Sequence, residues 1–249
     1  MTLNNDEDLQ RLKEIGRICA NAVQIMGAAL EPGITTAELD AIGRKVLEDA
    51  GARSAPELTY NFPGATCISV NEEIAHGIPG ARVIQAGDLV NIDVSAEKNG
   101  LFADTGSSFA VPPIKPQIER LCRDGKRAMW VGLNEVKAGK PLAAIGNAIG
   151  SFARKNRYTL VTNLASHGVG RSLHEEPTEI ATWPDKHEKR RMTDGMVFTI
   201  EPFLSLGAQW AEGGDDEWTL YSEPRAPTVQ YEHTVVVTRN GPMVVTLPG

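Results

Sequence analysis

Three acidic residues stand inside segments whose other residues are typical of buried strands. Asp93 lies within Leu89–Ser95, Glu201 within Met196–Pro202, and Glu232 within Val229–Val237. A carboxylate in apolar surroundings costs free energy unless a cation pairs with it. A single strand glutamate is usually structural, but the same conflict repeated along one chain predicts a shared cation site.

Asn99-Gly100 is a strong signal for a two-residue hairpin turn, and it fixes the pairing of the strands on either side. The predicted pairs are Lys98 with Leu101, Ser95 with Asp104, and Asp93 with Gly106. In this register Asp93 and Asp104 are diagonal neighbours on one face of the sheet. The alternative is two polar residues on a solvated face. The apolar residues around Asp93 favour a strand covered on both sides, so the hairpin predicts two converging carboxylates.

His167 lies in the segment His167–Gly170, where two glycines allow backbone and imidazole to approach a ligand closely. The combined set of Asp93, Asp104, His167, Glu201 and Glu232 is rich in oxygen and has one imidazole. Such a set suits two divalent metal ions, and Co²⁺, Mn²⁺, Fe²⁺, Zn²⁺ and Ni²⁺ are the candidates. Two such ions lower the pKa of a bridging water and hold an attacked carbonyl, which predicts a hydrolase.

Two further histidines lie in loops bounded by glycine or proline, rather than on apolar helix faces. They are His76 in Ala75–Pro79 and His174 in Leu173–Pro177. His187, by contrast, lies in the run of charged residues Asp185–Arg191, and we expect it to be solvated.

The elements that must position these residues begin with helices. Apolar spacing predicts a helix over Leu9–Ala29, with a buried face of Leu12, Ile15, Ile18, Ala22, Ile25 and Ala29. A second helix begins at Thr35 or Thr36 and ends near Ala50. Strands follow at Cys67–Val70, Asp88–Ala96 and Leu101–Val111. The next helices are expected over about Lys115–Val136 and, after Gly139, up to about Lys155, with strands late in the chain.

The order of elements therefore repeats. Sliding residues 31–51 by 106 positions onto 137–157 matches Gly33 with Gly139 and Val46 with Phe152. No Gly/Ser-rich or Pro-rich linker separates two cores. We predict an α/β chain of the α+β kind with a single catalytic domain over 1–249, made of pseudo-repeat halves of about 1–112 and 113–249. A cleft between the halves would hold the site.

These segments resemble the motifs of the type I methionine aminopeptidases over nearly the whole chain. The motifs are Ser69-Val70-Asn71-Glu72, Ala75-His76-Gly77-Ile78-Pro79, Asn91-Ile92-Asp93-Val94, Asp104-Thr105, Ser166-His167-Gly168-Val169-Gly170, His174-Glu175-Glu176-Pro177, Phe198-Thr199-Ile200-Glu201-Pro202 and Gln230-Tyr231-Glu232-His233-Thr234. The resemblance implies a pita-bread fold, with pseudo-symmetric helix-helix-strand halves around a curved, mainly antiparallel sheet. It implies hydrolytic removal of the initiator methionine from nascent proteins when the second residue is small.

The resemblance also implies roles for individual residues. The metal ligands are the same five residues, and Asp104 and Glu232 bridge both ions. Glu201 handles the proton of the bridging water, His174 steadies the oxyanion, and His76 contacts the scissile amide. Substrate binding falls to His76, His174, Phe62, Cys67 and Trp218, which form an apolar slot suited to a thioether.

Three positions depart from the family's pattern. Leu173 stands where the bacterial enzymes commonly carry an aromatic residue, and Pro56 and Thr59 replace other usual pocket residues. The detailed shape of the pocket is therefore open. The short interval between His174 and Glu201 lacks the helical insertion of the type II enzymes.

Composition narrows the partners. The net charge of −7 gives no electrostatic footprint for nucleic acid. Three cysteines at no metal-like spacing favour a reducing compartment, and neither a secretory signal nor a membrane span is expected. We expect a cytoplasmic monomer that acts on the N-termini of nascent polypeptides, with the ribosome as a further candidate partner.

Two other functions share the predicted fold. An Xaa-Pro aminopeptidase or dipeptidase shares the fold and the ligands, but such enzymes normally carry an additional N-terminal domain. A non-catalytic binding protein of the same fold would usually lose ligands, whereas here all five are present. A methionine aminopeptidase therefore remains the leading hypothesis.

Overall fold

The computed structural model describes residues 1–3 and 5–249. Its helices are α1 (Asp6–Ala29), α2 (Thr36–Asp49), α3 (Ala55–Tyr60), α4 (Pro116–Leu133) and α5 (Ala143–Asn156). Its strands are β1 (Arg53–Ser54), β2 (Cys67–Val70), β3 (Glu73–Ala75), β4 (Leu89–Lys98), β5 (Leu101–Ala110), β6 (Thr159–Leu160), β7 (Ser166–Gly168), β8 (Glu175–Ile180), β9 (Val197–Ile200), β10 (Phe203–Ser205), β11 (Trp210–Gly213), β12 (Leu220–Glu223), β13 (Thr228–Gln230), β14 (His233–Thr238) and β15 (Gly241–Val244).

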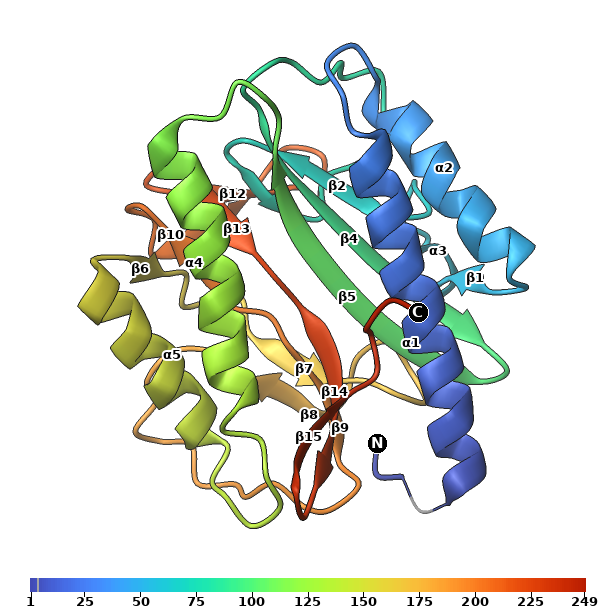
Figure 1. Cartoon of the computed structure of the whole chain (residues 1–249), viewed down its shortest axis with the longest axis vertical. Helices are drawn as coiled ribbons and strands as arrows, with labels where there is room; N and C mark the ends of the chain where they lie inside the picture. Colours follow the sequence, from blue (N-terminus) through green and yellow to red (C-terminus); the bar gives the residue numbers. More distant parts are fainter. Residues whose placement is uncertain (4) are drawn as a thin grey trace.

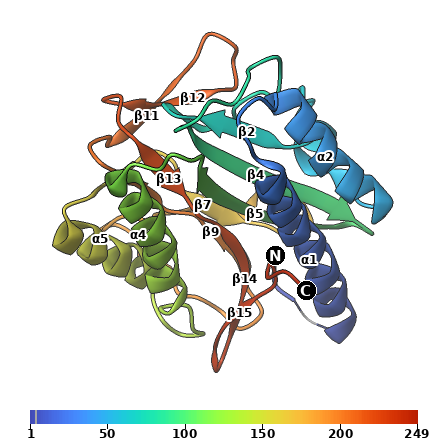
Figure 2. The same ribbon diagram turned by 45° about the horizontal axis from the view of Figure 1, so that its top comes forward.

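Two helix pairs flank the middle of the molecule. α1 and α2 lie on one side, α4 and α5 lie on the other, and β5 and β14 run between them (Figure 1, Figure 2). Strand pairing among the described residues is antiparallel throughout. The strands form four sheets, in the orders β1-β4-β2 with β5 on β4, β13-β10-β6, β11-β12-β3, and β15-β14-β9-β7-β8. The predicted class is confirmed, although the antiparallel strands are divided among several sheets.

The helices predicted from apolar spacing are all present, and one residue on the first of them was misplaced. Ile25 is 47% exposed, whereas Met26 is fully buried. At this turn the buried residue lies four positions after Ala22, at Met26, rather than three positions after it, at Ile25. A helix of 3.6 residues per turn alternates between steps of three and four. α1 packs on β4 and β5 through this stripe.

The hairpin of β4 and β5 has the predicted register. Asp93 opposes Gly106 and Ser95 opposes Asp104. Asn99 and Gly100 have φ angles of 53° and 79°, the left-handed conformation that a type I′ turn requires. Both strands are buried along most of their length. The alternative of a solvated hairpin face is therefore wrong.

Glu201 and Glu232 lie where strands end, so the prediction of continuous strands through them is wrong. β9 ends at Ile200, and the predicted strand Val229–Val237 is divided into β13 and β14 with Glu232 in the gap. β13 pairs with β10, whereas β14 pairs with β9. Between them the backbone N–H of Glu232 donates to Gly106 O on β5 at 2.9 Å. The chain breaks there because it changes hydrogen-bonding partners.

β5 joins the two halves through buried threonine side chains. Thr234 Oγ1 accepts a hydrogen bond from Asp104 N at 3.0 Å and donates one to Asp104 O at 2.8 Å. Thr105 Oγ1 donates to Glu232 O at 2.7 Å. The backbones of Asp104 and Glu232, one from each predicted half, are thus fixed against each other at this seam.

The two halves contain similar helix pairs. α2 and α5 each have 14 residues, and each helix pair is followed by strands. One hydrophobic core lies under α1 and α2, and a second lies under α4 and α5. The single domain over 1–249 and the relation of its halves by repetition stay predictions.

The short helix α3 was not predicted, because six residues are too few for an apolar period to be visible. Ser54 caps its first turn by accepting from Glu57 N at 3.3 Å. Asn61 ends it with a left-handed φ of 55°. The helix therefore has a defined start and stop although it lacks an amphipathic pattern.

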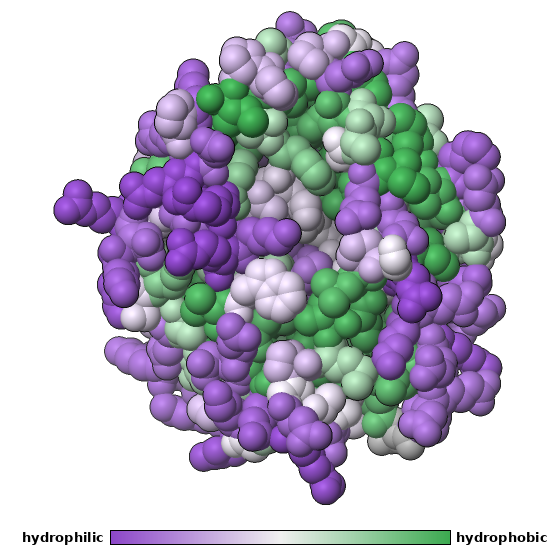
Figure 3. All heavy atoms as spheres, in the orientation of Figure 1, coloured by the Kyte–Doolittle hydropathy of each residue, from purple (hydrophilic) through white to green (hydrophobic). Residues whose placement is uncertain are grey.

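The outward side of the helix pairs is mostly hydrophilic (Figure 3). On α4, Arg120, Arg123 and Arg127 surround the buried carboxylate of Asp124 at 3.2 to 3.4 Å. Across the described residues, no helix has the length and apolar character needed to cross a membrane.

A buried aspartate fixes the segment that leads into β2. Asp40, on α2, accepts hydrogen bonds from Thr66 N at 2.8 Å, Thr66 Oγ1 at 2.7 Å and Ala65 N at 3.2 Å. Hydrogen bonds to a charged acceptor are among the stronger ones in proteins. Asp40 thus positions the chain that enters β2 at Cys67.

Asp40→Ala should lower the free energy of unfolding by about 2–3 kcal/mol, because three buried donors lose a charged acceptor. Urea unfolding followed by tryptophan fluorescence measures the loss. Asp49→Ala on the same helix is the matched control, since Asp49 is exposed and pairs with exposed Lys45, and it should hardly move the midpoint. Equal losses in the two variants would contradict the anchoring role of Asp40.

Candidate metal centre

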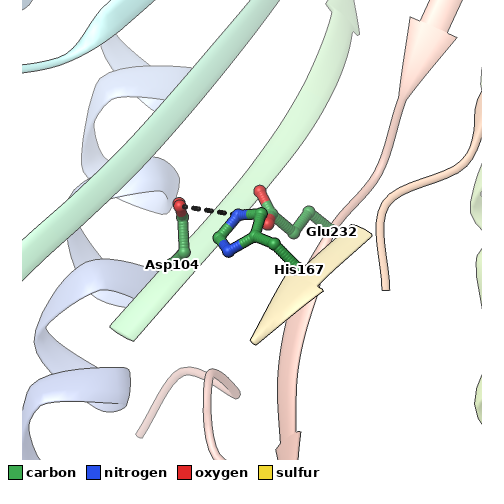
Figure 4. A group of neighbouring side chains, drawn as sticks. All are labelled: Asp104, His167 and Glu232. Carbon is green, nitrogen blue, oxygen red and sulfur yellow. Dashed lines mark ion pairs between the residues drawn. The ribbon is translucent and has the colours of Figure 1, made fainter. Parts of the chain in front are cut away.

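Side chains from both halves converge at the seam between β5 and β14. Asp104 on β5, His167 on β7 and Glu232 between β13 and β14 have ligand atoms that all lie within 4.8 Å of one another. In Figure 4 the carboxylates of Asp104 and Glu232 flank the imidazole of His167. His167 Nε2 lies 3.8 Å from Asp104 Oδ2 and 3.5 Å from Glu201 Oε1. Glu201 therefore joins the same group.

Asp93 reaches this group through a glutamine to which the sequence patterns assigned no role. Gln230 Nε2 donates to Glu232 Oε2 at 3.0 Å and lies 3.4 Å from Asp93 Oδ2. Asn91 Nδ2 donates to Gln230 Oε1 at 2.8 Å and so fixes the orientation of the amide. All five residues predicted as ligands are thus gathered, and one neutral amide orients two of them. The sequence signal for Gln230 was its place at the start of the family motif that contains Glu232.

The carboxylates repel one another in a buried environment. Burial raises the pKa of Asp104 to about 6. Burial, and after it the charge of Asp104, raises the pKa values of Asp93, Glu201 and Glu232 well above their ordinary range. Desolvation and like charge both disfavour the ionised forms. A bound cation would reverse both effects, so the cluster has the electrostatics of a metal site.

Two carboxylate oxygens in the cluster are buried without any donor among the described residues. They are Asp104 Oδ1 and Glu232 Oε1. Such orphaned acceptors cost free energy unless something outside the chain satisfies them. They belong to the two residues for which the family resemblance implies a bridging role, and the donor set fits divalent cations.

His167 is held as a neutral ligand. Its Nδ1 lies 3.1 Å from Gly168 O, which is a donor contact, so Nε2 keeps the lone pair that faces the carboxylates. Burial lowers the pKa of His167 to about 3. The imidazole therefore does not compete with a cation for its own proton at neutral pH.

Gly168 brings His167 and His174 together. A Cβ at Gly168 would lie 2.5 Å from Glu176 O and 2.6 Å from Glu175 O, so only glycine lets β7 lie this close to β8. The sequence predicted that this glycine allows close approach to a ligand, whereas the structure shows that it allows close approach to β8. The His174 ring consequently lies 4.0 Å from the His167 ring, measured between centroids.

Thr199 organises the other side of the cluster and was also missed. Its Oγ1 donates to Glu201 Oε1 at 2.9 Å and accepts from His167 N at 3.2 Å. Glu201 N donates to Ser166 Oγ at 3.0 Å. Because Thr199 alternates with Phe198 and Ile200 in a buried strand, it reads in sequence as an ordinary β-branched residue.

A cleft of about 260 Å³ opens beside the cluster. Its lining includes every residue predicted for substrate binding, which are Phe62, Cys67, His76, His174 and Trp218. Asp93 and Asp104 of the cluster also line it. The cleft is smaller than the roughly 300–1,000 Å³ typical of drug-sized ligands. It therefore suits a single side chain.

The cleft's apolar wall combines aromatic, sulfur and aliphatic groups. Phe62 and Trp218 meet edge to face, with centroids 5.2 Å apart and planes at 83°. Burial raises the pKa of Cys67 well above its ordinary value, so this free cysteine remains a thiol. Pro56 and Leu173 also line the cleft, as do Tyr60 and Ser95, which were not predicted from the sequence to do so. Thr59 is exposed and is not among the lining residues.

The loop that carries His76 is held in an unusual conformation. His76 has a φ of 54°, in the left-handed region that residues other than glycine seldom adopt. Gly77, next to it, packs so closely on β2 that a Cβ would lie 2.3 Å from Ile68 O. Gly77 N also donates to Ser69 Oγ at 3.0 Å. This close packing explains how the predicted loop places His76 at the cleft.

Trp218 is positioned by an aspartate that carries no catalytic signature. Asp216 Oδ1 accepts from Trp218 N at 2.9 Å and from Thr219 N at 2.7 Å. These bonds close a tight turn between β11 and β12. β12 in turn pairs with β3, which ends just before His76. The cleft's far wall is thus tied to the strand that precedes His76.

Comparison with known proteins gives a consistent result. The family model described as metallopeptidase family M24 matches residues 10–239. The chain is 47% identical over 247 residues to a methionine aminopeptidase of Staphylococcus epidermidis, which covers 99% of this chain and 98% of that protein. The crystal structure of a methionine aminopeptidase from Rickettsia prowazekii superposes with a TM-score of 0.94 and 30% identity, covering 99% of this chain and 100% of that one.

A prolidase from Pyrococcus furiosus shares the fold alone. Its TM-score is 0.79 at 20% identity, and the match covers 100% of this chain but 66% of that one. The pita-bread fold expected from the sequence is confirmed by these superpositions. Because the family match spans most of the chain and a carboxylate-rich cluster lies at its centre, this chain belongs to metallopeptidase family M24.

Proposed function

We propose that this chain is a methionine aminopeptidase, a metal-dependent hydrolase that removes the first methionine of a polypeptide. One observation carries the proposal: a five-residue ligand cluster with two orphaned carboxylate oxygens adjoins an apolar cleft of about 260 Å³, sized for one side chain. The full-length relatives named methionine aminopeptidase support the same activity.

The ligand cluster would hold two divalent ions between Asp93, Asp104, His167, Glu201 and Glu232. When bound, the ions would supply Lewis-acid polarisation of a carbonyl and lower the pKa of water. Glu201 would accept a proton from the attacking water, because its carboxylate belongs to the cluster, with Oε1 3.5 Å from His167 Nε2. Thr199 holds one oxygen of Glu201 at 2.9 Å, which orients the carboxylate.

The two cleft histidines would act on the substrate. His174 faces the cleft beside His167 and would donate a hydrogen bond to the oxygen on which negative charge develops. His76 also lines the cleft and would contact the scissile amide. Both roles follow from the resemblance, and their shared location in the cleft supports them.

The apolar wall would receive the methionine side chain. Phe62 and Trp218 offer ring edges and faces, and Cys67 offers a sulfur, all of which make favourable contacts with a thioether. Leu173 supplies an aliphatic surface where the bacterial enzymes commonly have a ring. Methionine would thus be held by fewer aromatic contacts at that point.

The wider setting is part of the proposal. We propose N-termini of nascent polypeptides as substrates, a cytoplasmic monomer, and the ribosome as a partner that brings enzyme and substrate together. The metal is proposed from the candidates Co²⁺, Mn²⁺, Fe²⁺, Zn²⁺ and Ni²⁺. Neither nucleic acid nor a membrane is proposed as a ligand.

A peptide panel tests the activity. Met-Ala-Ser and Met-Gly peptides should be cleaved, Met-Leu poorly, and Ala-Pro not at all, because a larger second residue would keep the carbonyl from its reactive position. Release of the first residue is measured by chromatography with each candidate metal. Cleavage of Ala-Pro in preference to Met-Ala would favour the Xaa-Pro peptidases, and no cleavage with any metal would favour a binding protein.

Metal should stabilise the protein more at pH 7.5 than at pH 5. The carboxylates have raised pKa values, about 6 for Asp104, so protons occupy them at pH 5 and compete with the cation, whereas at pH 7.5 Asp104 is ionised. His167, with a pKa of about 3, does not compete at either pH. The measurement is the shift in melting temperature on adding Mn²⁺ or Zn²⁺ to chelator-treated protein. A shift of equal size at both pH values would count against this cluster as the binding site.

Glu201→Gln should reduce kcat by at least about 100-fold while changing KM much less, because an amide cannot accept the proton of the attacking water. Glu212→Gln, at an exposed strand position, is the control and should keep full turnover. Metal content is measured in both variants to separate lost chemistry from lost metal. Near-normal kcat in metal-loaded Glu201→Gln would show that another group is the base.

A further inference from the structure

A tyrosine from the first half of the chain contacts the predicted oxyanion residue from the second half. Tyr60 Oη lies 2.7 Å from His174 Nδ1, and the two rings are 5.7 Å apart at 52°. Both side chains line the cleft. Neither the sequence motifs nor the proposed roles of the cleft histidines account for this hydrogen bond of Tyr60.

The tyrosine is carried on a firmly anchored element. Ser54 Oγ donates to Ala65 O at 2.9 Å, and Glu57 of α3 forms a two-pronged ion pair with Arg44 of α2 at 2.6 and 3.0 Å. Asn61 ends α3 directly after Tyr60 with its left-handed backbone. The position of Tyr60 is therefore fixed by contacts outside the cleft.

His174 is restrained on its remaining sides as well. Its carbonyl accepts from Ser172 Oγ at 3.0 Å. Its ring packs against that of His167, with centroids 4.0 Å apart and planes tilted by 40°, and His167 is itself held by Gly168 O. Rotation of the His174 ring about its own axis is restrained by Tyr60. Without that bond, either ring nitrogen could face the cleft.

The direction of the hydrogen bond follows from the acidity of the two groups. A phenol is a much stronger acid than the N–H of a neutral imidazole, so Tyr60 donates and Nδ1 accepts. Within the described part of the chain, Tyr60 Oη has no other hydrogen-bond partner. An imidazole that accepts at Nδ1 carries its proton on Nε2. That leaves an Nε2–H donor for the cleft.

We propose that Tyr60 is a positioning residue, which holds His174 in the tautomer and orientation that present Nε2–H to the developing oxyanion. This inference rests on the proposed aminopeptidase function. The two neighbouring imidazoles are then each set by a hydrogen bond at Nδ1, with opposite results. Gly168 O accepts from Nδ1 of His167 and leaves a lone pair for a cation, whereas Tyr60 donates to Nδ1 of His174 and leaves a proton for an anion.

Nuclear magnetic resonance of the resting protein tests the tautomer without substrate. The chain has five histidines, so ¹⁵N-histidine spectra of the Zn²⁺-loaded protein are simple, and His174→Gln assigns the signal. Wild type should show His174 with its proton on Nε2. Tyr60→Phe should show a mixture of tautomers or a mobile ring, and an unchanged His174 signal would overturn the proposal.

Kinetics test the consequence for turnover. Tyr60→Phe should lower kcat on Met-Ala-Ser by about three- to tenfold, the worth of one hydrogen bond between neutral groups, with KM changed less than about twofold. In a His174→Ala background the same substitution should have no further effect, because the tyrosine acts only through the histidine. An equal loss in both backgrounds would mean that Tyr60 contacts the substrate, which would overturn the positioning role.

A matched variant and the two readouts separate the outcomes. Tyr158→Phe removes a hydroxyl that donates to Asp124 at 3.0 Å, away from the cleft, and should leave kcat and the His174 signal unchanged. If wild type fails to cleave methionine peptides, the proposed function fails, while the spectra still decide whether Tyr60 sets the tautomer. A kcat loss in Tyr158→Phe equal to that in Tyr60→Phe would show a general loss of structure and would also overturn the proposal.

Discussion

Mutual repulsion among buried carboxylates is the constraint on which the rest of this structure depends. Asp93, Asp104, Glu201 and Glu232 are brought together with their pKa values raised, and two of their oxygens lack donors within the described chain. Such a cluster is stable only when cations bind to it, or when protons bind to it at a cost in function. The surrounding hydrogen bonds are therefore arranged to hold oxygens in place rather than to neutralise them.

The seam between the two halves is where that arrangement is made. Glu232 lies in a break between two strands because its backbone leaves one sheet and bonds to β5. The hydroxyls of Thr234 and Thr105 add hydrogen bonds between β5 and this segment. Ligands from both halves are thus set by main-chain hydrogen bonds. Displacement of β14 would consequently move a predicted ligand and a structural contact together.

Two histidines with similar surroundings are given different chemistry by their hydrogen-bond partners. A carbonyl fixes the tautomer of His167, and a phenol faces the same ring nitrogen of His174. The first arrangement suits a cation and the second suits an anion. In the proposed mechanism, this pairing would let one small volume next to an apolar cleft stabilise opposite charges on either side of a peptide carbonyl.

The sequence by itself predicted the hairpin register and the main helices, because these depend on local turn chemistry and on apolar periodicity. It also predicted the five residues that gather in the cluster, from charged residues inside apolar segments, and the family resemblance implied the residues that line the cleft. It did not determine Gln230, Thr199 or Tyr60, whose partners lie on other segments and whose residue types look ordinary in their strands or helix. It also misplaced Glu201 and Glu232 inside continuous strands, since an apolar run does not show where a chain changes sheets. Those features were decided by the tertiary structure, because hydrogen bonds between residues more than a hundred positions apart, such as Tyr60 with His174, exist only after the halves have packed.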